Sequence, residues 1–191
     1  MPVGILGKKR IEASEFGASL ALLLFTWWKD EGKTIFDSVI DKTSAGATKS
    51  KGAEEALVLG MFAVTRACES SIAETHALPA VLDSFHRSLY GLLIQDGVIK
   101  SRRVAPNLTL DGSVVAGEFE SELVRPRYQE YRSAFSCRDP VPNLGRVVIR
   151  ALGSSEEDGI AILRFANVAS AVLAVMAETI GNLRKDYRIA L

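Results

Sequence analysis

The chain has 191 residues, of which 48% are hydrophobic and 24% charged. These proportions exclude wholesale disorder, because the chain can bury enough apolar surface to offset its conformational entropy. Lysine plus arginine equals aspartate plus glutamate at 23 each, which excludes the overall positive charge that drives non-specific nucleic-acid binding. Two cysteines are too few for a disulfide scaffold, and no small-residue cleavage site follows the first apolar run. We therefore expect one cytoplasmic domain over residues 1–191, and we do not expect it to bind nucleic acid.

The first predicted helix covers residues 11–31 and is apolar around most of its circumference. Its apolar run, Phe16–Trp28, is shorter than the roughly 20 residues that a membrane-spanning helix needs, so no membrane span is expected. Leu22 and Phe25 lie opposite the broadest apolar face. Either both are buried and this is the central core helix, or they form half of an interface with Trp28 near its rim.

Gly32 is expected to end this helix, and a short amphipathic helix follows it. Residues 43–52 are small, polar and without periodicity, which predicts a mobile loop. Two longer helices come next, one beginning near Ala53 and the other with Pro79 in its first turn. Residues 97–117 form either an irregular connection or a small β-hairpin near 108–115, in which Asp111 and Gly112 make the turn.

Helical character returns at Gly117, and Pro126 must break, kink or restart that helix. Residues 146–152 fit either a strand or a turn of helix. The capping-box spacing of Ser154 and Glu157 predicts a long final helix. The fold class is therefore mainly α: a single-domain bundle of about five or six helices, to which a small hairpin near 108–115 is added if 97–117 is not irregular.

The final predicted helix has a flank of small residues beside its apolar face, comprising Ala166, Ser170, Ala174, Ala177 and Gly181. Small residues let another helix approach closely, and that neighbour is either part of this chain or a second subunit. Together with the first helix, this flank supplies the candidate interface residues: Leu22, Phe25, Trp28, Ser170, Ala174 and Gly181.

The segment between Leu123 and Gly153 has a local net charge of +4, because it holds six arginines against Glu130 and Asp139. Arginine binds phosphate and carboxylate groups in a two-pronged geometry, and tyrosines alternate with these arginines. We therefore consider a site for a small anionic ligand, formed by Arg125, Arg127, Tyr128 and Arg132. The competing interpretation is that these arginines pair with acidic residues elsewhere in the fold or line a protein interface.

Asp83 and His86 form a second candidate cluster, with Tyr90 on the same edge of the predicted helix. A carboxylate and an imidazole at this spacing can bind one metal ion, or the carboxylate can orient the histidine as a base. The sequence shows no second copy of the pair, which a di-iron bundle would require. The competing interpretation is a surface ion pair of Asp83 with Arg87 beside a boundary histidine.

The leading functional hypothesis is a soluble helical protein-interaction module that self-associates through apolar helix faces, or binds another protein. The alternative is a small-anion-binding protein or enzyme that uses the arginine-rich segment 125–150, with Asp83 and His86 as a base or metal pair. Familiar catalytic signatures, such as a glycine-rich phosphate loop or a nucleophilic serine turn, are missing from the sequence. The sequence therefore assigns no catalytic residue and no cofactor.

Overall fold

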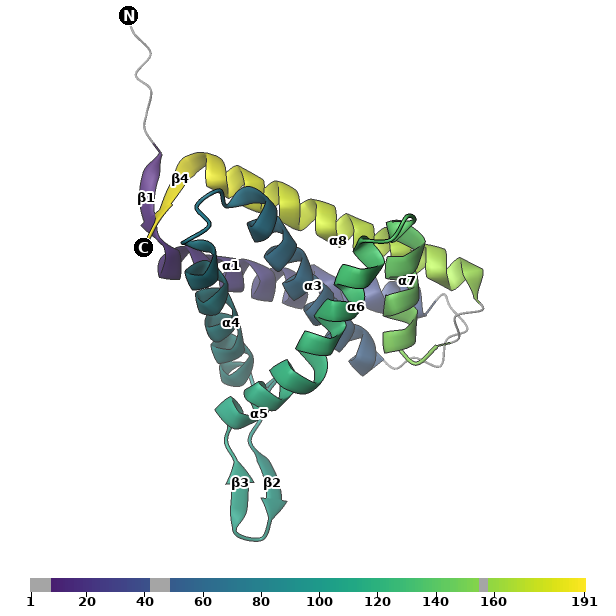
Figure 1. The fold of residues 1–191 in the computed structure, drawn as a ribbon. Coiled ribbons are helices and arrows are strands. Elements are labelled where there is room, and N and C mark those ends of the chain that lie inside the picture. The colour runs from purple at the N-terminus through teal and green to yellow at the C-terminus, as the bar shows by residue number, and fades with distance from the viewer. Residues whose placement is uncertain (1–7, 42–48, 155–157) are drawn as a thin grey trace, which may run out of the picture.

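Six continuous helical segments and two short β pairings make up residues 8–41, 49–154 and 158–191, which the computed structural model describes (Figure 1). Helices account for 76% of these residues, and the mainly α fold class is confirmed. A small hairpin is also present, but its first strand, β2 (Arg102–Ala105), lies before the predicted 108–115, of which β3 (Leu108–Leu110) takes the start and residues 112–115 are helical.

The first helical segment continues through Gly32, so the prediction that this glycine ends a helix is wrong. Helix α1 (Ala13–Trp27) passes through a π-helical turn, η1 (Trp28–Gly32), into α2 (Lys33–Ile40) without leaving helical dihedrals. Space at position 32 is tight, because a Cβ atom there would lie 3.0 Å from the ring of Trp27. The π-helical turn thereby packs the backbone closely against an indole.

Helix α3 (Lys49–Ser71) is the central helix of the bundle, a role that residues 11–31 were one candidate to fill. All of its side chains from 55 to 65 are buried, around the full circumference. A helix that is covered all round needs neighbours on every side. The predicted loop 43–52 lies largely outside the described residues, and its last part, 49–52, forms the first turn of α3, so this helix begins before Ala53.

Helix α4 (Leu78–Gln95) crosses α1 at close range, and Pro79 lies in its first turn as predicted. The crossing depends on Gly17, because a Cβ atom there would lie only 2.4 Å from the carbonyl oxygen of Val81. Beside it, the Ser84 hydroxyl donates a hydrogen bond to the carbonyl oxygen of Ser14 at 2.6 Å. This contact fixes the angle between the two helices.

The connection predicted over 97–117 contains the hairpin, which projects from the bundle (Figure 1), and then the start of a helix. Asp111 is not part of the hairpin turn. It caps helix α5 (Gly112–Phe119), accepting hydrogen bonds from the backbone nitrogens of Ser113 and Val114 at 2.9 and 3.0 Å. An Asp-Gly pair suits either a hairpin turn or a helix N-cap. Here it forms the cap, because the free backbone N–H groups at the start of α5 need an acceptor.

Helix α5 continues through a second π-helical turn, η2 (Glu120–Val124), into α6 (Arg125–Phe135). Pro126 lies in the first turn of α6, where the α-helix restarts after the wider turn. A restart is one of the three outcomes predicted for this proline. Proline lacks the backbone N–H that an uninterrupted α-helix would use at this position. The π-helical turn therefore lets the helix proceed past the proline.

Helices α7 (Pro140–Ala151) and α8 (Gly159–Asp186) complete the bundle, so residues 146–152 are helical apart from the final leucine. The cap of α8 is Asp158, which accepts from the backbone nitrogens of Ile160 and Ala161, rather than the predicted Ser154. Glu157 lies outside the described residues. Strands β1 (Lys9–Glu12) and β4 (Tyr187–Ala190) pair in parallel and join the two ends of the described chain.

We predict that Gly17→Ala lowers the free energy of unfolding by about 1 to 3 kcal/mol, because the added methyl group collides with the backbone of α4. Urea denaturation of the purified protein measures this change.

The matched control is Gly117→Ala in α5, where no heavy atom lies within 4 Å of the new Cβ. It should raise the free energy of unfolding by about 0.5 to 1 kcal/mol through helix propensity alone. Equal effects of the two substitutions would contradict the close crossing of α1 and α4.

Candidate functional site

Helix α8 runs along one side of the bundle (Figure 1), and its outer face carries an exposed apolar stripe together with the exposed polar residues Arg164, Asn167 and Glu178. Ile160 and Leu163 are 66% and 57% exposed near its first turns. Further along, Ala174 and Ala177 are exposed and Ser170 is half-buried. The helix is long and apolar enough to cross a membrane by length and composition, and 39% of its most apolar stretch is buried in this fold.

The two ends of the small-residue flank of α8 lie in different surroundings. At its first part, Ala166 is buried against α7, where a Cβ on Gly145 would lie 2.2 Å from the carbonyl oxygen of Ile162. At its last part, a Cβ added to Gly181 would meet no heavy atom within 4 Å. An intramolecular neighbour therefore occupies one end of the flank, and the other end faces open space.

The candidate interface residues of the first helical segment differ in exposure. Leu22 is 57% exposed, Phe25 is half-buried against the ring of Trp28, and Trp28 itself is only 3% exposed. The neighbouring Trp27 instead reaches the surface, where it lines a hollow of about 310 Å³ between α1 and α8. Thus Trp27, and not Trp28, stands at the edge of the apolar stripe on α8.

The arginine-rich segment is held by carboxylates on neighbouring helices. Arg125 pairs with Glu120 at 3.3 Å, and Arg132 reaches Glu69 on α3 at 2.5 Å. Arg150 on α7 lies 3.5 Å from Glu130 on α6. The structure thus places acidic partners beside the guanidinium groups that the sequence offered as an anion site.

Arg127 lies deepest of these arginines and belongs to a buried polar cluster with Glu55 and Tyr131. Its Nε atom is 3.4 Å from Oε2 of Glu55, and its Nη1 atom is 3.1 Å from Glu130. The hydroxyl of Tyr131 donates a hydrogen bond to Oε1 of Glu55. Burial raises the pKa of Glu55 from 4.5 to about 7, against the opposing charge of Arg127.

Sequence reasoning missed this cluster, because a helical wheel places Glu55 on the polar face of its helix. The partner, Tyr131, is 76 residues away along the chain. Glu55 can be recognised as a buried carboxylate only once α6 is known to pack on α3. The cluster joins α6 to α3 through one hydrogen bond, from Tyr131, and one ion pair, from Arg127.

The hydrogen-bond partners of His86 are groups other than Asp83. The Nδ1 atom of His86 lies 2.9 Å from the carbonyl oxygen of Leu82, and its Nε2 atom lies 3.3 Å from the hydroxyl of Tyr128. Asp83 is exposed on the same helix. No group of three metal-binding side chains exists among the residues that the structure describes. Burial lowers the pKa of His86, although the negative charge of Glu120 opposes that shift.

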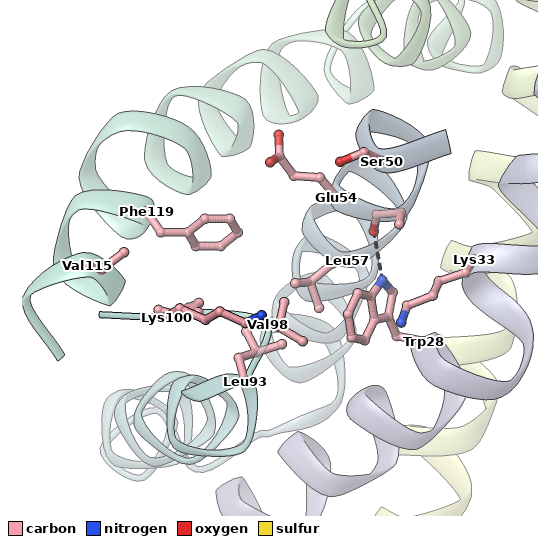
Figure 2. A pocket seen from close by; sticks show the side chains of 12 residues that line it. Trp28, Lys33, Ser50, Glu54, Leu57, Leu93, Val98, Lys100, Val115 and Phe119 are labelled. Carbon is pink, nitrogen blue, oxygen red and sulfur yellow. Dashed lines mark hydrogen bonds between the residues drawn. The ribbon is translucent and has the colours of Figure 1, made fainter. Parts of the chain in front are cut away.

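A pocket of about 460 Å³ opens between η1, α3, the end of α4 and α5. Figure 2 shows Trp28 and Phe119 on opposite sides of it, with Leu57 between them. The Trp28 indole nitrogen donates a hydrogen bond to the carbonyl oxygen of Ala53 at 2.7 Å. The full lining consists of Trp28, Lys33, Ser50, Ala53, Glu54, Leu57, Leu93, Val98, Ile99, Lys100, Val115 and Phe119.

Comparison of the chain with known protein families, with curated proteins and with solved structures finds no match. Function is therefore inferred from the surfaces, pockets and charges of this chain.

The raised pKa of Glu55 predicts a pH-dependent stability. The folded protein holds the proton of the Glu55 carboxyl more tightly than the unfolded chain does. The contribution of this protonation to the free energy of unfolding is therefore complete below pH 4.5 and is lost as the pH rises to about 7. Between pH 4.5 and 7 the wild type should lose up to about 3 kcal/mol of its free energy of unfolding relative to Glu55→Gln, whose amide does not titrate. Urea denaturation at a series of pH values measures it.

Glu54→Gln is the matched control, since Glu54 is the exposed neighbour on the same helix. The stability difference between that variant and the wild type should change much less between pH 4.5 and 7. A difference for Glu55→Gln that stays flat over the same interval would contradict the burial of an ionisable carboxyl.

Proposed function

We propose that the chain is a self-associating helical interaction module that forms a dimer through the outer face of α8. The observation that carries this proposal is the uneven distribution of side-chain size along the stripe. Large residues, Ile160 and Leu163, stand exposed near one end, and small residues, Ala177 and Gly181, lie near the other. Such a stripe fits a second copy of itself in the opposite direction.

Two α8 helices related by a two-fold axis near Ser170 would run antiparallel. Ile160 of one copy would then lie opposite the partner subunit's Gly181, and Leu163 opposite the partner subunit's Ala177. Large side chains fill the space that small ones leave, which is how helices interdigitate at short axial distances. The same patch serves on both subunits, as a two-fold interface requires.

Charge and polarity support the same arrangement. The two-fold axis would bring Arg164 close to the partner subunit's Glu178, so that opposite charges lie near each other at two places in the dimer. Asn167 and Ser170 lie within the stripe, and polar residues in an apolar helix seam specify register. The formal net charge of zero leaves no long-range repulsion between copies.

Helix α1 would supply the rim of the interface. Leu22 is exposed there, and Trp27 bounds the hollow that Ala171 and Val175 of α8 also line. A rim of this kind adds apolar area beside the central helix pair. The two cysteines are free thiols, which suits the cytoplasm in which we propose that the dimer works.

Ligand binding by the arginine-rich segment is the weaker candidate function. Arg125, Arg127 and Arg132 each have a carboxylate within ion-pair distance. An anionic ligand would have to displace those carboxylates, and the displaced acids would then repel it.

We predict that Ala174→Glu raises the dimer dissociation constant on the order of a hundredfold, because it places a charge at the centre of the interface. Ala174 is exposed in the single chain, so the folded monomer should keep its stability. Sedimentation velocity across a concentration range measures the effect. Leu108→Glu is the control, since Leu108 is 54% exposed on the hairpin and outside the proposed interface.

The proposed charge pairing predicts the behaviour of a reciprocal exchange. Arg164→Glu and Glu178→Arg should each weaken the dimer, by about tenfold, and the double variant should recover most of the lost affinity. A wild-type protein that stays monomeric at high micromolar concentration would overturn the proposal. A monomer that floats with phospholipid vesicles would instead assign the stripe to a membrane surface, and would overturn it equally.

A further inference from the structure

The pocket beside Trp28 carries an inference that is independent of dimer formation, because none of its lining residues belongs to α8. We propose that it binds a small organic anion with an apolar body and one negatively charged headgroup. Its volume of about 460 Å³ lies in the range of roughly 300 to 1,000 Å³ that is usual for small-molecule sites.

The walls of the pocket suit the apolar body of such a ligand. Trp28 and Phe119 stand at opposite sides, and Leu57 and Leu93 cover the space between them (Figure 2). The indole nitrogen of Trp28 is already satisfied by the carbonyl oxygen of Ala53 at 2.7 Å. The ring is thereby fixed in orientation, and the small part of its surface that stays exposed lies at the pocket.

The charged residues at the pocket suit an anionic headgroup. Lys33 and Lys100 both line it, and within the described ranges neither lysine forms an ion pair with a carboxylate. The ammonium group of Lys33 lies 3.8 Å from the centroid of the Trp28 ring. Glu54 is the one acidic residue of the lining, so the described pocket has a net charge of +1.

This distribution differs from that of the arginine-rich segment. The guanidinium groups of Arg125, Arg127 and Arg132 are placed beside carboxylates, whereas these two ammonium groups are placed beside apolar walls. A positive charge beside a low-dielectric surface attracts an anion more strongly than one in open water. The small anion that the sequence raised as an alternative therefore has a better position at the lysines.

The pocket is also held in shape by contacts between its walls. Lys29 of η1 forms an ion pair with Asp96 at the end of α4, with a distance of 2.7 Å between the charged atoms. Gly97 then turns the chain with a φ of +72°, a left-handed conformation that favours glycine, and directs Val98 to Lys100 along the pocket. A pre-formed site of this kind loses little entropy on binding.

The test uses decanoate, with decan-1-ol and decylamine as neutral and cationic probes of the same chain length. Trp27→Phe leaves Trp28 as the only tryptophan, so its fluorescence reports on the pocket directly. We expect decanoate to alter this fluorescence and to bind about tenfold more tightly than decan-1-ol, since charge-assisted hydrogen bonds are worth about this much.

In the same Trp27→Phe background, Lys100→Met and Lys33→Met should each weaken decanoate binding, by about threefold to tenfold, and leave decan-1-ol binding unchanged. Lys185→Met, at the end of α8, is the matched control and should change neither. Val115→Phe should weaken both probes by filling the pocket. Decanoate binding should persist in Ala174→Glu, so that loss of the dimer and loss of the site are separate results.

Three outcomes would overturn the proposal. The first is no saturable response of Trp28 to decanoate in a protein that is shown to be folded. The second is equal affinity for decanoate and decan-1-ol, which would leave a merely apolar pocket. The third is tighter binding of decylamine, which would show that Glu54 and not the lysines sets the charge preference.

Discussion

The structure depends on the complete enclosure of α3. A helix whose side chains are buried from 55 to 65 has no face for water, so neighbouring helices must pack around it. Once they do so, their inner faces are determined by α3 and by one another. What remains for function is their outer faces and the gaps where neighbouring helices diverge, which are the α8 stripe and the pocket beside Trp28.

Enclosure also explains the polar cluster at Glu55. A carboxyl group at this depth is stable only with polar partners, and Tyr131 and Arg127 of α6 provide them. The cluster is directional, whereas the apolar contacts around it are not. It therefore fixes how α6 lies on α3, and with it the arrangement of the arginine-rich segment against the acids of α3 and η2.

The two π-helical turns have a related consequence. Each interrupts a long helix, η1 between α1 and α2 and η2 between α5 and α6, and each lies next to an aromatic residue of the pocket. Trp28 is the first residue of η1, and Phe119 directly precedes η2. Such turns recur at functional sites because the wider turn redirects the side chains that follow it. Here they accompany the two aromatic walls of the pocket.

The sequence by itself determined the mainly α class and the two long helices after residue 49, and it offered a hairpin between 97 and 117 as one of two alternatives. These features follow from the spacing of apolar residues and from turn and cap residues, which act within a few positions of one another. The sequence also located α8 and its small flank. It could not tell whether Gly32 ends a helix or leaves room for the Trp27 ring, because glycine suits both roles.

Only the tertiary structure decided which of the apolar faces are covered. The sequence offered Leu22, Phe25 and Trp28 as one group, but the fold exposes Leu22, half-covers Phe25 and buries Trp28. It likewise paired the arginines with acids and left Lys33 and Lys100 beside an apolar pocket. The reason is physical: periodicity fixes the direction of a side chain relative to its own helix, and burial and pairing depend on what the rest of the chain brings opposite it.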